Sequence, residues 1–167
     1  CKVVVASGGA DKKNLLYSVS KVLLKLNIKK IIVIIGKGVL AKNKIFSLEK
    51  EKTINLIRNS ENIKKYFDMG DANLVSGGTV MFESIATGKP TIVIKNYEHQ
   101  KFAIDFFKKN KNIYSFTSIS KLNSRKVDFF LKLAEKNYLK IYKKNVSTID
   151  GLGIKRINDA LFKFINK

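Results

Sequence analysis

The chain has 167 residues, the size of one globular domain, and its 45% hydrophobic content excludes a mainly disordered protein. Its 33 basic and 13 acidic residues give a net charge of +20, but the lysines are spread along the chain and only three residues are arginine. Because arginine is the preferred reader of bases and phosphates, we favour a solvated basic surface over a nucleic-acid-binding one. A single cysteine, Cys1, excludes an internal disulfide and a thiolate metal site, and it fits a reducing compartment.

The first residues predict a buried strand rather than a signal peptide, so we expect a cytoplasmic domain cut from a longer chain. The longest apolar run, residues 31–35, is too short to span a bilayer. The surplus of lysines leaves peripheral contact with the anionic inner face of the membrane as an open alternative.

Short apolar runs alternate with amphipathic stretches along the chain, a pattern typical of a parallel sheet with crossover helices. Two of the helices are expected to stop at glycines, Gly70 and Gly88. In chain order the pattern predicts strand 2–6, helix 12–26, strand 31–35, a loop rich in Gly, Lys and Asn, strand 53–57, helix 60–69, strand 72–76, helix 79–87, strand 91–95, helix 99–109, strand 113–116, and helices 124–144 and 151–164.

Six strands with interleaved helices predict one α/β domain over residues 1–167, a doubly wound, Rossmann-like parallel sheet with helices on both faces. Residues 31–35 are continuously apolar, as expected of a strand that is covered on both faces. Ligands of such sheets bind outside the carboxyl ends of the strands. The chemistry is therefore expected in the loops that follow the first five strands.

The first candidate loop, Ser7-Gly8-Gly9-Ala10-Asp11, joins the first strand to a helix. Two adjacent glycines let backbone N–H groups converge on an anion, and the helix N-terminus adds partial positive charge. Asp11 is a suitable N-cap. The alternative is a tight turn without a ligand. The full dinucleotide-binding and P-loop glycine patterns are absent from the sequence, which argues against a dehydrogenase and an ATPase.

The loop after the fourth strand, Ser76-Gly77-Gly78-Thr79, opens a helix in the same way. Glu83 lies about one turn after Thr79 on the same helical face, and its side chain is expected to lean toward the helix N-terminus. A carboxylate in that position can accept hydrogen bonds from both hydroxyls of a ribose while the turn holds the phosphates. The alternative is an exposed or capping glutamate.

The loop after the fifth strand contains the only histidine of the chain, His99, followed by Gln100. Polar groups at a strand end suit sugar hydroxyls, whereas a lone histidine is more often structural than catalytic. The sequence offers no second histidine, catalytic triad or metal-ligand cluster beside it. Catalysis by this chain alone therefore has little support, and His99 is the one candidate for it.

Taken together, these motifs resemble the C-terminal, nucleotide-sugar-binding half of GT-B enzymes. The most similar groups are the pseudaminic-acid-pathway UDP-sugar hydrolase and its spore-coat polysaccharide relatives, followed by the peptidoglycan N-acetylglucosaminyltransferase that makes lipid II. The residues that carry the resemblance are the two glycine turns, Glu83, Gly88-Lys89-Pro90, His99-Gln100 and an ending Asp150-Gly-x-Gly-x-x-Arg156-Ile157 that is similar to the hydrolase group.

The resemblance implies a partner and a role for each matching residue. The partner is UDP or a UDP-sugar, with no cofactor, no metal and no nucleic acid expected. The N-terminal Rossmann-like half of these enzymes, whose Gly-x-Gly-His motif carries the general base in the hydrolase group, has no match in this sequence. Gly8 and Gly9 would line the diphosphate, Gly77, Gly78 and Thr79 would hold it at the second helix N-terminus, Glu83 would bind the ribose, the backbone of Ile57 would face the uracil, and His99 and Gln100 would lie near the sugar.

Three interpretations of the whole chain remain open at this point. The first is the donor-binding half of a UDP-sugar-processing enzyme of bacterial surface polysaccharide synthesis, which hydrolyses the UDP-sugar or transfers its sugar. The second is a free-standing UDP-sugar-binding subunit, with a membrane-attached partner chain that supplies the acceptor site. The third is a basic module for nucleic acid or a membrane surface, whose binding would weaken steeply with salt.

Overall fold

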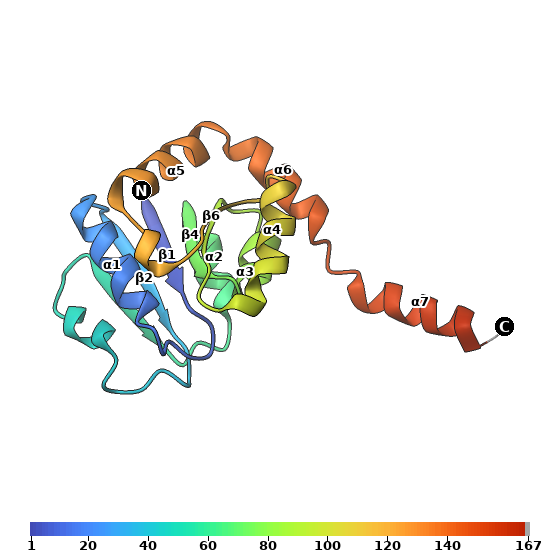
Figure 1. Ribbon diagram of the computed structural model, residues 1–167, viewed down its shortest axis with the longest axis horizontal. Coiled ribbons are helices and arrows are strands. Elements are labelled where there is room, and N and C mark those ends of the chain that lie inside the picture. Colours follow the sequence, from blue (N-terminus) through green and yellow to red (C-terminus); the bar gives the residue numbers. More distant parts are fainter. Residues whose placement is uncertain (166–167) are drawn as a thin grey trace.

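The computed structural model describes residues 1–165, which contain one six-stranded sheet (Figure 1). Its strands are β1 Lys2–Ala6, β2 Lys30–Ile35, β3 Ile54–Arg58, β4 Ala72–Ser76, β5 Thr91–Ile94 and β6 Ile113–Phe116. All five neighbouring pairs are parallel, in the order β3-β2-β1-β4-β5-β6. This is the doubly wound, Rossmann-like order, so the predicted fold is confirmed.

Helices cover both faces of the sheet (Figure 1). They are α1 Leu15–Lys25, α2 Ile63–Met69, α3 Thr79–Ala86, α4 Lys101–Lys109, α5 Ser124–Lys136, α6 Tyr138–Thr148 and α7 Gly153–Ile165, with 3-10 helices η1 Lys44–Leu48, η2 Glu98–Gln100 and η3 Ile119–Lys121. Because successive strand residues point to opposite faces, the sheet has two apolar cores. Val3 and Val5 pack in the core shared with α1 and α5, whereas Val4 and Ala6 pack in the core shared with α2, α3 and α4.

The first helix begins at Leu15, three residues later than predicted, because residues 11–14 form a turn. Asn14 ends this turn in the left-handed region, at φ 52°, which asparagine tolerates better than most residues. The Asp11 carboxyl accepts hydrogen bonds from the backbone N–H of Leu15 at 2.7 Å and of Leu16 at 3.2 Å. Asp11 therefore caps α1 from four residues before it rather than from the N-cap position.

The predicted helix 124–144 is two helices, α5 and α6, which meet at Asn137. The Asn137 side chain donates a hydrogen bond to the carbonyl of Leu133 at 2.8 Å, and its backbone leaves helical geometry at φ −108°, ψ 17°. Asparagine interrupts helices in this way because its amide competes for backbone groups. The prediction of a single helix was wrong because the apolar periodicity continues across the break.

The two glycines predicted to stop helices do so for different reasons. Gly88 follows α3 at φ 77°, the left-handed conformation expected of a helix stop. Gly70 also ends α2 as predicted, but with extended backbone at φ −79° rather than in the left-handed region. A Cβ at Gly70 would lie 2.9 Å from the Val4 side chain, and close packing therefore explains the glycine.

The last helix, α7, extends away from the rest of the domain (Figure 1), and every described residue in it is exposed. The turn before α7 is defined by Asp150, whose carboxylate pairs with Arg156 and accepts a hydrogen bond from the backbone N–H of Leu152 at 3.0 Å. Gly151, in the same turn, has φ 76°. None of the described helices is long and apolar enough to cross a membrane.

Candidate functional site

A cavity of about 280 Å³ lies at the carboxyl edge of the sheet, where the loops after β1, β2 and β3 meet α3. It brings together four of the predicted site residues, Gly8, Gly9, Thr79 and Glu83. Its remaining lining residues are Ala6, Ile34, Ile35, Gly36, Lys37, Asn59, Ser60, Glu61, Ile63 and Val80. The location agrees with the general rule that doubly wound sheets bind ligands at this edge.

The turn after β1 is held in place by close contact with the loop after β2. Gly8 has φ 84°, a conformation that only glycine adopts readily. A Cβ on Gly36 would lie 2.1 Å from the carbonyl oxygen of Gly8, and the backbone N–H of Gly38 donates to the carbonyl of Gly9 at 2.8 Å. A Cβ added at Gly9 would have no described neighbour within 4 Å apart from the adjoining residues of the chain. Gly36 therefore supports the turn, and Gly9 faces open space.

The N-terminus of α1 is already occupied by a side chain of the protein. Asp11 is 3% exposed, and its carboxyl accepts the N–H groups of Leu15 and Leu16 and a hydrogen bond from Asn43 at 3.3 Å. Burial raises the pKa of the Asp11 carboxyl, and these three hydrogen bonds oppose the rise. An anion at this helix would meet a carboxyl group instead of free N–H donors.

The N-terminus of α3 is different, because among residues 1–165 no side chain caps it. Gly78 stands at its N-cap position with extended backbone, and a Cβ built there would have only ordinary contacts, at 3.8 Å and beyond. Gly77 is packed instead: a Cβ there would lie 2.5 Å from the Cδ1 of Ile104. The open N-terminus of α3 is thus the better anion site of the two.

Gln100 has a role that the sequence does not reveal. It is 6% exposed, and its Oε1 accepts the backbone N–H of Asn96 at 2.9 Å and of Tyr97 at 3.2 Å. Because two donors fix the position of Oε1, the amide nitrogen Nε2 is directed elsewhere. Nε2 would lie 3.8 Å from a Cβ added at Gly78, so this amide nitrogen is close to the open N-terminus of α3.

Five residues that the resemblance places around the ligand do not line the cavity: Ile57, Gly77, Gly78, His99 and Gln100. Ile57 lies in β3 opposite Ile34 and packs against the core on the α2 side. His99 is exposed, and its ring stacks on Tyr97 with centroids 5.7 Å apart. Their predicted contacts with uracil and sugar stay predictions.

Sequence reasoning missed several residues of the cavity. Gly36 and Lys37 follow β2, and residues 59–61 follow β3. The signal for this part of the site in the sequence is Gly36, a glycine directly after a continuous apolar strand. Its contact with the Gly8–Gly9 turn joins loops that are far apart in sequence, so only the folded chain shows it.

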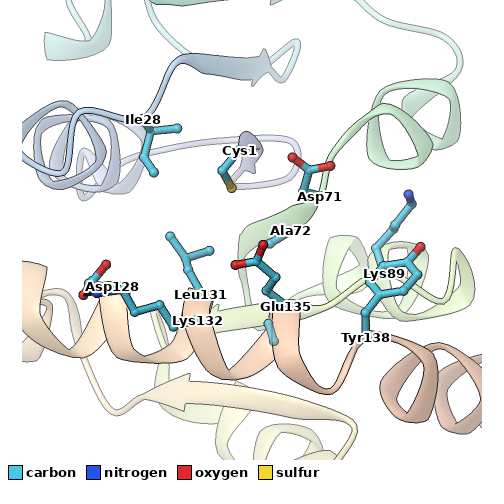
Figure 2. A pocket seen from close by; sticks show the side chains of 11 residues that line it. Cys1, Ile28, Asp71, Ala72, Lys89, Asp128, Leu131, Lys132, Glu135 and Tyr138 are labelled. Atoms are coloured by element: carbon cyan, nitrogen blue, oxygen red, sulfur yellow. Dashed lines mark ion pairs between the residues drawn. The ribbon is translucent and has the colours of Figure 1, made fainter.

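Another cavity, of about 530 Å³, lies at the opposite, amino edge of the sheet (Figure 2). Cys1 and Asp71 face the α5 residues Leu131 and Glu135 across it. The Asp71 carboxylate already accepts the backbone N–H of Lys2 at 2.7 Å. Among residues 1–165 no group of three or more His, Cys, Asp or Glu could hold a metal ion there or elsewhere.

The sequence of residues 2–146 matches the model of the glycosyltransferase family 28 C-terminal domain. The chain belongs to this family. A comparison with curated protein sequences found no match.

Two similar solved structures are larger proteins, of which the matching region is only a part. A glycosyltransferase from Rickettsia africae ESF-5 covers 99% of the chain with a TM-score of 0.70 and 15% identity, and MurG from Acinetobacter baumannii covers 97% with 0.68 and 13%. The chain spans only 48% and 49% of those two proteins. The C-terminal CMP-Kdo binding domain of WaaA from A. baumannii has a TM-score of 0.57 and 11% identity, with 89% of each chain covered.

Proposed function

We propose that this chain is the donor-binding half of a UDP-sugar-processing enzyme of bacterial surface polysaccharide synthesis. The observation that carries the proposal is the convergence of Gly8, Gly9, Thr79 and Glu83 on one cavity at the carboxyl edge, beside an uncapped helix N-terminus. Membership of the glycosyltransferase family 28 C-terminal domain supports it. So does the similarity to a domain described as binding CMP-Kdo, itself a nucleotide-linked sugar.

The diphosphate is proposed to bind at the N-terminus of α3 rather than of α1. Backbone N–H groups and the helix dipole favour an anion at a free helix N-terminus. Asp11 already uses the first N–H groups of α1, whereas Gly78 and Thr79 open α3 without a side-chain cap. Gly9 and Lys37 line the cavity from the facing loops, and Lys37 adds a positive charge.

Glu83 is proposed to accept both hydroxyls of the ribose. It lies one turn after Thr79 in α3, lines the cavity and is exposed. In the part of the chain that the structure describes, the Glu83 carboxylate has no ion pair with the protein, so it is available to a ligand. The loop of residues 59–61, which lines the cavity after β3, is then the wall nearest to the base, beside the predicted contact at Ile57.

This chain's own residues bind and orient the donor, and the catalytic group is proposed to come from a second half. His99 is the one candidate within the chain, but it is exposed and stacked on Tyr97 outside the cavity. The similar structures are about twice as long as this chain, which supports a further half. That half is either part of the same protein or, in the alternative proposal, a separate partner chain.

The exposed face of α7 is the surface that we assign to that second half. Ile154, Ile157 and Leu161 recur at helical spacing on it, with exposed fractions of 78%, 62% and 53%. Exposed apolar side chains that gather on one helix face often mark an interaction site. The Asp150–Arg156 pair fixes the turn into α7, and it gives the motif shared with the hydrolase group a structural role. The motif supports kinship with that group, and it adds no catalytic residue to the cavity.

Calorimetry with uridine, guanosine and adenosine diphosphates tests the proposed function. We expect UDP to bind and the other two to bind more weakly. A folded sample that gives no heat with any of the three would refute the proposal. Repeating the titration at rising salt separates it from the nucleic-acid alternative, since binding to a phosphate backbone weakens far more steeply with salt.

A further inference from the structure

A buried chain of polar side chains joins α3 to the two strands beneath it. The side-chain amide of Asn73 in β4 donates to the hydroxyl of Ser84 in α3 at 3.0 Å, and the Ser84 hydroxyl lies 2.8 Å from that of Thr91 in β5. Asn73 and Ser84 are fully buried, and Thr91 is 1% exposed. The Thr91 hydroxyl donates to the carbonyl of Lys89 at 3.1 Å. Because each hydroxyl has one proton, Ser84 is then the donor to Thr91, and the chain runs in one direction from β4 through α3 to β5.

Stability alone does not require polar groups in this place. The Oδ1 of Asn73 has no hydrogen-bond partner among the described residues. A buried acceptor without a partner lowers stability, whereas apolar side chains of similar shape would avoid that loss. What the hydrogen bonds add is direction, because they fix the angle between the groups that they join, and hydrophobic contacts do not.

Directional contacts are scarce elsewhere on α3. Helices α2 and α5 are each capped by an asparagine side chain, whereas no side chain within residues 1–165 caps the N-terminus of α3. The other buried residues of α3 are apolar: Val80, Met81 and Ile85. The hydrogen bonds of Ser84 therefore set how α3 is turned against the sheet, while its N-terminus stays open.

The position of the Glu83 carboxylate depends on how α3 is turned. Glu83 directly precedes Ser84, so the two side chains leave the helix about 100° apart. Ser84 points to the sheet, and Glu83 lines the cavity at the carboxyl edge. Glu83 has no ion pair with a described residue that would hold its carboxylate there. Turning α3 by about 20° would move a carboxylate about 5 Å from the helix axis by about 2 Å, which is enough to break a hydrogen bond.

We propose that Asn73, Ser84 and Thr91 are positioning residues for the donor: they fix the rotation of α3 and thereby direct Glu83 at the two ribose hydroxyls. The inference rests on the proposed function, which assigns the ribose to Glu83. A carboxylate that accepts two neighbouring hydroxyls has to meet both in the right direction, so its binding is sensitive to small changes in orientation.

A double-mutant cycle, measured by calorimetry with UDP and with 2′,3′-dideoxy-UDP, tests the proposal. Ser84→Ala should weaken the binding of UDP about tenfold and leave the binding of the dideoxy nucleotide unchanged. In the Glu83→Ala background, Ser84→Ala should cause no further loss, because its effect acts through a carboxylate that is no longer present. An equal loss for both nucleotides, or an undiminished further loss in the Glu83→Ala background, would overturn the proposal.

Ser20→Ala is the matched control. Ser20 is a fully buried serine on α1, and its hydroxyl has no hydrogen-bond partner among the described residues. The same chemical change is thus made at the same burial without breaking the polar chain, and the affinity for UDP should be unchanged.

The two variants at Thr91 separate hydrogen bonding from packing. Thr91→Val removes the hydroxyl with little change of shape and should repeat the effect of Ser84→Ala. Thr91→Ser keeps the hydroxyl and should bind UDP as the wild type does. If Thr91→Ser loses as much affinity as Thr91→Val, packing rather than the hydrogen bond is responsible, and the proposal is wrong.

A measurement without ligand distinguishes a failure of this proposal from a failure of the proposed function. Backbone residual dipolar couplings of the free chain report the orientation of α3 relative to the sheet. We expect this orientation to change in Ser84→Ala and Thr91→Val but not in Ser20→Ala. If it changes while the wild type binds no UDP, the orienting role stands and the proposed nucleotide site fails. If α3 keeps its wild-type orientation in both variants, the orienting role is refuted whether or not UDP binds.

Discussion

Alanine at Gly9 or Gly78 should weaken UDP binding while leaving the fold intact. A Cβ at Gly9 would meet no described atom within 4 Å, and at Gly78 it would meet only ordinary contacts at 3.8 and 3.9 Å. Neither glycine has a positive φ, so alanine fits both backbones. The added methyl group would instead occupy the space in which a phosphate approaches the backbone.

The size of the effect follows from the hydrogen bonds at stake. A hydrogen bond to a charged group contributes about 1.5–3 kcal/mol, so losing one such bond should weaken UDP binding roughly ten- to a hundredfold. Glycine to alanine at a compatible position changes stability by about 1 kcal/mol or less, which corresponds to a melting-temperature shift of about 2–4 °C in a domain of this size. Calorimetry with UDP and thermal unfolding followed by circular dichroism measure the two effects separately.

Gly77→Ala is the contrasting variant, because its Cβ would lie 2.5 Å from the Ile104 Cδ1 and 3.1 Å from the Gln100 Cβ. Overpacking of this kind costs about 1–3 kcal/mol of stability. Gly153→Ala, exposed and without neighbours in the described chain, is the control that should change neither property. If the variants at Gly9 and Gly78 both bind UDP as tightly as the wild type, the phosphates do not approach these backbones and the site assignment is wrong.

Four further predictions test individual groups. Glu83→Ala should weaken UDP binding about ten- to a hundredfold by calorimetry without lowering the melting temperature, and an equal affinity would remove the ribose assignment. Gln100→Glu keeps an oxygen that can accept the two loop N–H groups, but it adds negative charge beside the N-terminus of α3. The affinity for UDP should therefore fall while the affinity for uridine stays unchanged. An equal loss of uridine affinity would indicate a disturbed loop. The isolated chain should release no UDP from UDP-sugars in a turnover assay, and robust release would return attention to His99. The ion pair with Arg156 lowers the pKa of the Asp150 carboxyl to about 2. Any stability that this pair provides is therefore present above the ordinary aspartate pKa of 3.8 and is lost as the pH falls toward 2. In an NMR titration, Arg156→Gln should return the pKa of Asp150 toward 3.8.

The strands could be predicted because local sequence largely determines them. The continuously apolar run Ile31 to Ile35 indicates a strand covered on both faces, and six strands alternating with helices leave few alternatives to a doubly wound sheet. The edge that carries the site follows from the same topology. Gly8, Gly9, Thr79 and Glu83, which the resemblance assigns to one ligand, line one cavity at that edge, and their contacts with the ligand stay predictions.

The features that escaped prediction depend on contacts between distant parts of the chain. Asn137 divides a helix whose apolar pattern gives no sign of a break. Gly36 is required by the carbonyl of Gly8, which lies 28 residues earlier in the sequence. The Oε1 of Gln100 accepts the N–H groups of Asn96 and Tyr97, a role within its own loop that the sequence does not show. The sequence pattern alone cannot show in which direction a polar side chain points.

The two glycine turns show most clearly why the folded chain was needed. In sequence they are nearly the same, a serine and two glycines between a buried strand and a helix. In the structure Asp11 closes one helix N-terminus with its own carboxyl, while α3 begins at Gly78 without a cap. A carboxyl and a phosphate compete for the same N–H donors. The free N-terminus of α3 can therefore bind a phosphate, whereas Asp11 occupies the N-terminus of α1. The first turn contributes the open face of Gly9, held in place by the loop at Gly36, and the diphosphate is expected between the two.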